Sequence, residues 1–281
     1  MGTFTIDGGH KLKGTLTPQG AKNEALQILA AVLLTADEVE LHNIPEIRDI
    51  LRMIELLKGL GVKVEHKAKG NWVFKADEID LDYFHTDEFR TKGAAIRGSI
   101  MIIGPLLARF GIGYIPSPGG DKIGRRRLDT HFIGFESLGA EFIYNKDTGF
   151  YKVEGKNLRG SYMLLEEASV TGTANILMAA VMAKGTTTIY NAACEPYLQQ
   201  LCKMINSMGG KISGVGSNLL VIEGVSELAG CVHTILPDMI EIGSFISLAA
   251  LTQSEITIEK CRVDQLGIIP KVFKKLGVQF I

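Results

Sequence analysis

The fold is decided by the stretch Leu57-Lys58-Gly59-Leu60-Gly61-Val62-Lys63-Val64, because its pattern occurs four times in the chain. The pattern is an apolar residue, two variable residues, Leu or Met, Gly, a small residue, a variable residue and an apolar residue. Glycine after an apolar helical stretch is typical of a helix C-terminus, and the residues that follow it begin a strand. The other three copies are Phe135–Phe142, Ile205–Ile212 and Phe273–Phe280.

The repeated glycines Gly61, Gly139, Gly209 and Gly277 are about 70 residues apart. Between them, an apolar helical end, a polar break and alternating strand residues recur, as in the stretch 181–191. One unit is therefore about 70 residues of strand, helix, strand, helix and strand pair, longer than a solenoid repeat. Such a unit can pack its helices against its own sheet, which predicts an α/β fold built of repeated βαβαββ units.

The fourth unit stops at Ile281, inside the strand expected after Gly277. A strand that ends there has no hairpin partner. We therefore expect the sequence to be a piece of a longer protein. The alternative is a protein whose C-terminus lies in that strand.

The composition excludes several classes of protein. The 281 residues, 46% hydrophobic and 22% charged, are typical of a soluble globular protein with one large domain or two. A net charge of −1 argues against a nucleic-acid partner. No apolar stretch is long enough to span a bilayer, and Met1–Gly14 has no secretory h-region. The four cysteines and six histidines show no metal-ligand spacing, which argues against a metal site and for reduced thiols in a cytoplasmic protein. We also expect no cofactor.

The loop Pro118–Thr130 combines glycines, one carboxylate and three arginines. Glycines allow a loop to close over a ligand, and an arginine cluster binds phosphate or carboxylate in a bidentate way. Asp121 in this setting is a candidate proton donor for chemistry on a phosphorylated substrate, beside the arginines 125–127. The alternative is a solvated basic turn.

Three further segments carry candidate anion-binding groups. Lys22 and Asn23 open the first long helix, where a lysine adds its charge to the helix dipole and the free N–H groups. Arg97 lies inside an otherwise apolar helix over residues 94–103, and a buried arginine needs a carboxylate or a bound anion. Ser169 and Thr171 precede another helix and offer hydroxyls to phosphate, although capping explains them equally well.

Together these segments resemble one family: Gly-Ala-Lys-Asn at 20–23, the Arg97 helix, Pro-Gly-Gly-Asp-x-Ile-Gly-x-Arg at 118–126 and Leu-Pro-Asp at 236–238. The chain is similar to the UDP-N-acetylglucosamine enolpyruvyl transferases (1-carboxyvinyltransferases), which perform the first committed step of peptidoglycan precursor synthesis. The resemblance implies six βαβαββ units in two three-unit domains, an inside-out α/β barrel. Residues 22–236 would form the first domain, and residues 1–21 with 237–281 an incomplete second domain.

The resemblance also implies roles for individual residues. Asp121 would be the proton donor, in place of the usual cysteine, so that epoxides of the fosfomycin type have no thiolate to alkylate. Two residues depart from the family pattern: Arg127 replaces a usual proline, and Glu167 replaces a usual lysine. Phosphoenolpyruvate would contact Lys22 and Asn23. UDP-N-acetylglucosamine would contact Arg97, Arg126, Arg127, Leu128, Asp129, Thr130, Ser169 and Val170.

The implied reaction is transfer of the enolpyruvyl group of phosphoenolpyruvate to the 3-hydroxyl of UDP-N-acetylglucosamine, with release of phosphate. The general base and further arginines would lie outside these 281 residues, so we expect the chain by itself to be inactive. The alternatives are a shikimate-pathway enolpyruvyl transferase and a non-catalytic repeat scaffold that binds a nucleotide or a protein. The expected partners are the two small substrates, with no nucleic acid and no membrane.

Overall fold

The computed structural model describes residues 3–115, 128–145 and 150–280. The chain forms two compact units. Unit 1 consists of Met1–Ala21 and Leu236–Ile281, and unit 2 of Lys22–Ile235. Unit 2 is thus a continuous segment inserted between the two parts of unit 1.

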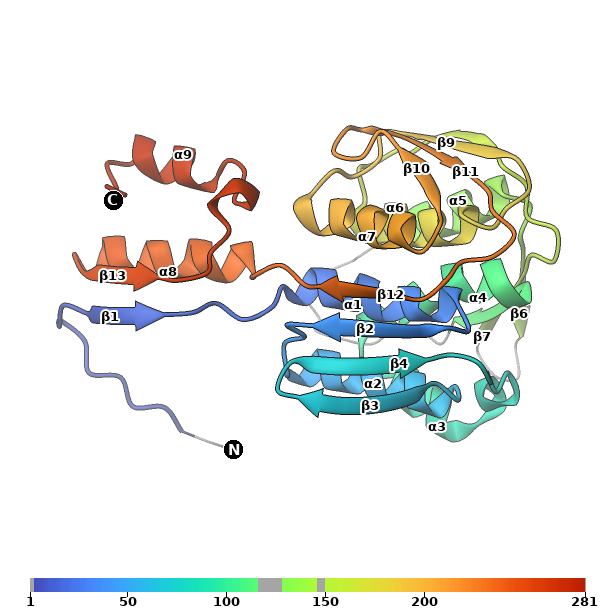
Figure 1. Ribbon diagram of the computed structural model, residues 1–281, viewed down its shortest axis with the longest axis horizontal. Coiled ribbons are helices and arrows are strands. Elements are labelled where there is room, and N and C mark those ends of the chain that lie inside the picture. The colour runs from blue at the N-terminus through green and yellow to red at the C-terminus, as the bar shows by residue number, and fades with distance from the viewer. Residues whose placement is uncertain (1–2, 116–127, 146–149, 281) are drawn as a thin grey trace. The chain divides into compact units, whose positions relative to one another are not determined.

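Unit 2 contains three sheets of the same design (Figure 1). In each of the two four-stranded sheets, the edge strand, called the lead strand here, pairs in parallel with the second strand. The third strand pairs antiparallel with the second, and the fourth antiparallel with the third. The third sheet has the same antiparallel order, and three of its strands lie in the described residues. In spatial order, the first sheet consists of β12 (Cys231–Thr234), β2 (Glu38–His42), β4 (Asn71–Lys75) and β3 (Lys63–Ala68). The other four-stranded sheet consists of β8 (Tyr162–Leu164), β9 (Thr186–Tyr190), β11 (Leu219–Glu223) and β10 (Lys211–Ser213). The third sheet consists of β5 (Ile112–Ile115), β7 (Phe150–Glu154) and β6 (Glu141–Asn145).

The repeat is therefore confirmed in space, with one difference in the connection. The lead strand of the first sheet is β12, in which Cys231 lies beside Val39 of β2. The strand that precedes the first helix in sequence, β1 (Lys13–Leu16), pairs instead with β13 (Glu255–Ile258) in unit 1. The chain enters unit 2 through a helix and completes its first sheet only with its last strand.

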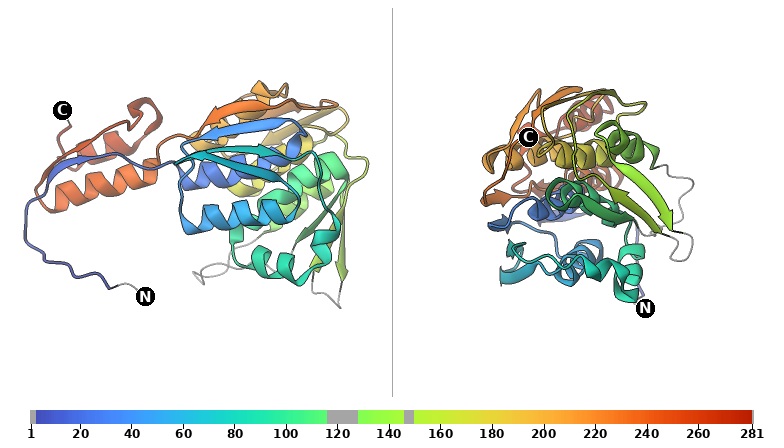
Figure 2. Two further views of the ribbon diagram at one scale, coloured as in Figure 1. Left: turned by 60° about the horizontal axis from the view of Figure 1, so that its bottom comes forward. Right: turned by 90° about the vertical axis from the view of Figure 1, so that its right-hand side faces the viewer.

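The helices of unit 2 lie between its sheets (Figure 2). The first helix of each repeat is buried on nearly all sides, as expected for a helix that is apolar all round. The second helix of each repeat buries only one face, and strands such as β9 alternate exposed and buried residues. The first helices are α1 (Lys22–Ala31, extended by η1, Val32–Leu34), η3 (Arg97–Ile102) with α4 (Ile103–Phe110), and α6 (Val170–Ala180); the second helices are α2 (Arg48–Gly59), α5 (Asp129–Ser137) and α7 (Pro196–Ser207).

The four repeated glycines end their helices in the same way. Gly61, Gly139, Gly209 and Gly277 have φ angles of 92°, 90°, 101° and 87°, which only glycine adopts without strain. In each case the next residue donates its N–H to a carbonyl five residues earlier, for example Val62 to Leu57 at 3.0 Å. This is the Schellman motif, so the sequence pattern is confirmed as a helix stop. A strand follows the first three glycines, whereas residues 278–280 lie in no strand.

Unit 1 is smaller and has a smaller core. It consists of a two-stranded parallel sheet, β1 with β13, and the helices α8 (Met239–Leu251), η4 (Val263–Gln265) and α9 (Ile269–Lys275). The buried cluster of unit 1 consists of Ile242, Ile246 and Leu266.

In the described residues, no single helix is long and apolar enough to cross a membrane. One bent pair passes that test on length and composition, namely α3 (Asp87–Ala94) with the segment Arg97–Phe110, at an angle of 115°. η2 (Asp82–His85) precedes this pair.

Candidate functional site

Several of the predicted anion-binding residues lie at the N-termini of the first helices of the three repeats. Lys22 and Asn23 are the first two residues of α1, Arg97 is the first residue of η3, and Val170 is the first residue of α6. η3 contacts both α1 and α6. Free N–H groups and the positive end of the helix dipole make such termini favourable places for phosphate or carboxylate.

Lys22 forms an ion pair with α2. Its Nζ lies 2.7 Å from Oδ2 of Asp49, and both side chains are about 40% exposed. An exposed pair of this kind stabilises the fold by at most about 1 kcal/mol. Asp49 therefore holds the ammonium group of Lys22 in place. Replacing this contact by one to a bound anion would cost little free energy.

The sequence prediction that Arg97 lies inside a helix is wrong. α3 ends at Ala94, Ile96 is extended, and the 3₁₀ helix η3 begins at Arg97. The break is stabilised by Ser99, whose hydroxyl is within 2.7 Å of the Gly93 carbonyl and 2.8 Å of the Ile96 carbonyl. Serine hydroxyls compete with helical hydrogen bonding in this way. Arg97 is half-buried at a helix start, which suits an anion contact better than a helix interior does.

Ser169 is the N-cap of α6. Its Oγ accepts a hydrogen bond from the N–H of Gly172 at 3.2 Å. The capping alternative therefore holds for this hydroxyl in the structure. A ligand at this terminus would be offered the remaining backbone N–H groups of the first turn.

The segment Leu128–Thr130 begins α5. Leu128 is its N-cap, Asp129 is exposed at the first position, and Thr130 is buried. The Thr130 hydroxyl donates to Oε1 of Glu167 at 3.3 Å. This contact connects the start of α5 to the segment that leads into α6. Asp121, Arg126 and Arg127 lie outside the described residues.

His131, which the sequence analysis did not single out, lies in the first turn of α5 and contacts α6. It is 2% exposed, and its Nδ1 lies 3.0 Å from Nδ2 of Asn175, while its Nε2 lies 3.3 Å from the hydroxyl of Thr171. An amide NH₂ can only donate, so Nδ1 accepts and Nε2 carries the proton. Burial, followed by the positive charge of Arg97, lowers the pKa of His131 to about 4. The imidazole is therefore neutral at pH 7.

Asn175 extends this contact to the second repeat. Its Oδ1 accepts from the N–H of Gly104 at 2.7 Å, and its Nδ2 donates to the carbonyl of Ile100 at 2.8 Å. A β-carbon on Gly104 would lie 2.2 Å from the backbone oxygen of Asn175, so glycine is required for this approach of α4 to α6. The network fixes the starts of η3, α5 and α6 relative to one another.

The start of α1 is packed onto η3 by an apolar contact. A β-carbon on Gly98 would lie 3.0 Å from the side chain of Leu26. Leu26 is one helical turn beyond Lys22, and Gly98 follows Arg97. The structure thus brings the starts of α1, α5, α6 and η3 into one contiguous region of unit 2.

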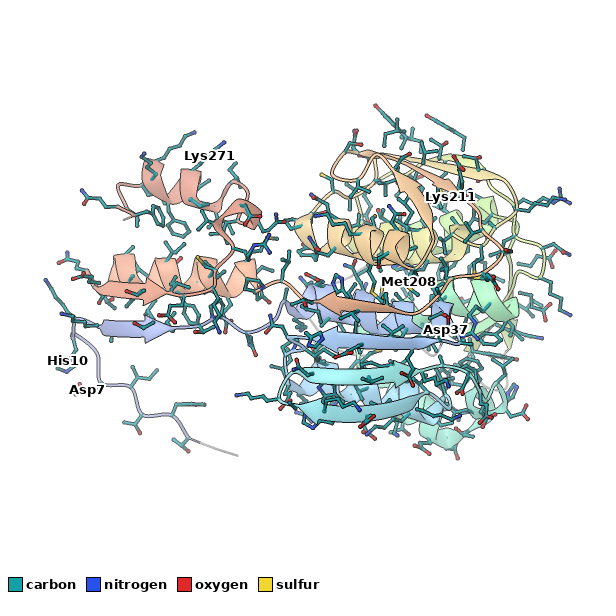
Figure 3. All side chains as sticks on the ribbon, viewed as in Figure 1. Asp7, His10, Asp37, Met208, Lys211 and Lys271 are labelled. Carbon is teal, nitrogen blue, oxygen red and sulfur yellow. The ribbon has the colours of Figure 1, made fainter. Side chains whose placement is uncertain are left out.

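Two grooves of unit 2 lie away from these residues. They have volumes of about 570 and 550 Å³ and are lined by residues at the C-terminal ends of α4 and α6, such as Arg109 and Met182. Asp37 and Met208, labelled in Figure 3, line the second groove. Arg109 donates there to the carbonyls of Leu33, Thr35 and Ala76, so its guanidinium caps backbone oxygens.

Within the described ranges, no three His, Cys, Asp or Glu side chains are grouped so that they could hold a metal ion. The four cysteines are free thiols, and burial raises the pKa of Cys202 to about 12. Such a thiol is not a reactive nucleophile.

Comparison with known proteins gives the family. The model of the EPSP synthase (3-phosphoshikimate 1-carboxyvinyltransferase) family matches residues 6–281. The chain belongs to this family. Among solved structures, the enolpyruvyl transferase NikO from Streptomyces tendae aligns with a TM-score of 0.81 at 18% identity, over 97% of this chain and 63% of that one. EPSP synthase from Acinetobacter baumannii gives 0.74 at 17% identity, over 95% and 60%. These confirm the enolpyruvyl transferase fold.

Curated relatives are much more similar in sequence. A protein of Bacteroides thetaiotaomicron is 60% identical over 279 residues, and one of Porphyromonas gingivalis is 58% identical over 278 residues. Each match covers 99% of this chain and 64% of the relative. Both relatives are named UDP-N-acetylglucosamine 1-carboxyvinyltransferase. The chain thus spans 64% of the length of the relatives it matches.

Proposed function

We propose that the chain is part of an enzyme that transfers the enolpyruvyl group of phosphoenolpyruvate to the 3-hydroxyl of UDP-N-acetylglucosamine, with release of phosphate. The observation that carries this proposal is the 58–60% identity, over 99% of the chain, to relatives named for that activity. The enzyme would supply a precursor of peptidoglycan. The proposal includes a cytoplasmic location, in keeping with four free thiols.

The reaction needs a proton at the methylene carbon of phosphoenolpyruvate, a base for the sugar hydroxyl and positive charge around the departing phosphate. Among the described residues, Lys22 would supply positive charge toward phosphoenolpyruvate and Arg97 toward the sugar nucleotide. Asn23 would add a neutral amide donor beside Lys22. The start of α6, at Ser169 and Val170, would donate backbone N–H groups to the diphosphate.

The nucleotide would also contact the segment that leads into α5. We assign it Leu128, Asp129 and Thr130, together with Arg126 and Arg127 of the preceding loop. Glu167 is not assigned a ligand contact, because its carboxylate accepts a hydrogen bond from Thr130 and would repel a diphosphate. His131 contacts Thr171 and Asn175. Because its imidazole is neutral, it adds no second positive charge near Arg97.

One further acceptor is suggested by the family itself. The family takes its name from 3-phosphoshikimate 1-carboxyvinyltransferase. The EPSP synthase structures share only 17% identity with this chain, whereas the relatives named for the sugar nucleotide share 58–60%. UDP-N-acetylglucosamine is therefore the first candidate, and shikimate 3-phosphate the second.

The test is a phosphate-release assay with phosphoenolpyruvate and each acceptor in turn. It uses protein expressed from the full coding sequence beside the 281-residue chain. We expect phosphate release with UDP-N-acetylglucosamine only, and only from the protein of the relatives' full length. Release with shikimate 3-phosphate would favour the second candidate. No release with either acceptor, with UDP-N-acetylglucosamine still bound, would favour a binding scaffold.

Asp121 provides a separate test of the proposed proton donor. A carboxylate is a far weaker nucleophile than a thiolate, so an epoxide of the fosfomycin type should not inactivate the enzyme. The Asp121→Cys variant should keep activity and become sensitive to the epoxide. Rapid inactivation of the unsubstituted enzyme, with the label recovered on Asp121, would contradict this assignment.

A further inference from the structure

Glu24 and His233 form a buried pair directly behind the first turn of α1. The His233 Nε2 lies 2.9 Å from Oε1 of Glu24, and the side chains are 10% and 0% exposed. The two residues are 209 positions apart along the chain. Glu24 is the third residue of α1, and His233 lies in β12, the strand that completes the first sheet.

The Glu24 side chain reaches from the third position of α1 to the sheet. A glutamate at the third position of a helix commonly turns back to the N-terminal backbone of its own helix. Here the carboxylate contacts a strand, because β12 alternates and places His233 on the less exposed face, between exposed Val232 and Thr234. The contact therefore joins the helix start to the sheet.

Stability alone does not account for such a pair. A buried ionisable pair loses hydration on folding, and an apolar pair of similar volume is often as stable or more stable. Buried polar pairs can instead specify one arrangement of the elements that they join. The arrangement specified here is the rotation of α1 about its own axis.

Helical geometry connects that rotation to the predicted anion-binding residues. Successive residues of an α-helix are rotated by roughly 100°, so positions 22 and 24 face directions roughly 200° apart. When Glu24 is fixed toward β12, Lys22 faces away from the sheet, where its side chain is 43% exposed beside Asp49. The backbone N–H groups of the same turn are fixed with it.

We propose that Glu24 and His233 are positioning residues that fix the first turn of α1, and thereby hold Lys22 and Asn23 ready for the phosphoenolpyruvate anion. This inference rests on the proposed function for the substrate that it names. Neither residue touches the substrate. Their effect should fall on the affinity for phosphoenolpyruvate and leave that for the sugar nucleotide nearly unchanged.

The test uses the full-length enzyme with the variants Glu24→Ala, His233→Phe and the double variant. Glu24→Gln and His233→Gln are the conservative forms, since each keeps a polar atom for the contact. Glu40→Ala is the matched control, because Glu40 lies 3.1 Å from His42 in a partly exposed carboxylate–imidazole pair on the neighbouring strand. Amide hydrogen exchange of residues 22–25 is measured beside the KM of each substrate.

We expect each disruptive variant to raise both the exchange of the first turn and the KM for phosphoenolpyruvate about tenfold, equivalent to about 1.4 kcal/mol. The double variant should be no worse than either single variant, because both remove the same contact. The conservative variants should recover most of the loss, and Glu40→Ala should change neither quantity.

Unchanged exchange at residues 22–25, or an equal rise in KM for both substrates, would overturn the proposal. If Glu24→Ala does not fold, the same two criteria are applied to Glu24→Gln and His233→Gln, whose partial effects must still fall on phosphoenolpyruvate. If the unsubstituted enzyme transfers no enolpyruvyl group while exchange still responds to the variants, the proposed function fails and the positioning of the turn stands.

Discussion

α6 in unit 2 and α8 in unit 1 are both strongly apolar helices, yet they differ in burial. Every residue of α6 from Gly172 to Ala180 is buried. In α8 only Ile242 and Ile246 are buried, and Leu251 is 85% exposed. The difference shows that an apolar sequence makes a helix suited to burial, while the surrounding elements decide whether burial occurs.

The surroundings of the two helices account for this difference. α6 is packed against α4 and α5 and contacts β11 of its own sheet. α8 has one two-stranded sheet beside it and shares a small cluster with Leu266. A two-stranded sheet is marginal in water without further cover. We therefore expect unit 2 to carry most of the stability of this chain.

The largest expected effect comes from truncating one leucine in each helix. Leu177→Ala in α6 removes a fully buried side chain and should cost about 2–5 kcal/mol of unfolding free energy. Leu251→Ala in α8 removes an exposed side chain and should change it by less than about 0.5 kcal/mol. Urea unfolding of both variants measures the contrast. Equal losses would mean that α8 is covered in solution by something that the described residues do not show.

The second expected effect is a loss of unfolding free energy at low pH, which we expect to arise in unit 2 and not in unit 1. His131 of unit 2 has its pKa lowered to about 4, so the unfolded chain takes up this proton first as the pH falls. Its stabilising contribution is complete above about pH 6.5 and is lost as the pH falls toward 4, with a total of about 3 kcal/mol. The one histidine in unit 1, His10, is exposed beside Asp7 (Figure 3).

The measurement is the unfolding free energy between pH 7 and pH 4, with His131→Gln as the variant that cannot titrate. The variant should be less stable at pH 7 and should show a shallower decline. A decline of the same steepness in both proteins would assign the acid sensitivity to other groups and remove this contrast between the units.

The fold was predictable from the sequence because its signals are local. The helix stops at Gly61, Gly139 and Gly209 need only a neighbouring apolar run and a residue that tolerates positive φ. The helix expected around Arg97 failed for an equally local reason, since the Ser99 hydroxyl competes for the carbonyls of Gly93 and Ile96. Composition gave no sign of that competition.

The site was only partly predictable, because its supporting contacts are distant in sequence. His131 and Asn175 are 44 positions apart, and Glu24 and His233 are 209 apart. The role of a single histidine among apolar residues cannot be predicted from its neighbours in sequence, because it depends on a partner that is distant in the chain. The positions of Lys22, Ser169 and Val170 at helix starts could be predicted, since capping and dipole rules depend on neighbouring residues.

The smallest expected effect is a gain in unit 1 that has an opposite counterpart in unit 2. Gly243 lies in α8, where an added β-carbon would meet only Ile269 at 4.0 Å. Gly243→Ala should therefore stabilise the helix by about 0.5–1 kcal/mol, because alanine loses less backbone entropy than glycine. Gly104→Ala in α4 places the same atom against the backbone oxygen of Asn175 at 2.2 Å and should cost about 1–3 kcal/mol.

The two substitutions are chemically identical, so they isolate the effect of packing. Opposite signs in urea unfolding are expected, with the loss in Gly104→Ala accompanied by a higher pKa of His131 as Asn175 is displaced and water reaches the imidazole. A loss in Gly243→Ala would show that α8 is closely packed on its glycine face. The exposed apolar residues of α8 would then no longer show that it is less closely packed than α6. The remaining difference between the two helices would be the number of strands in the sheet beside each of them.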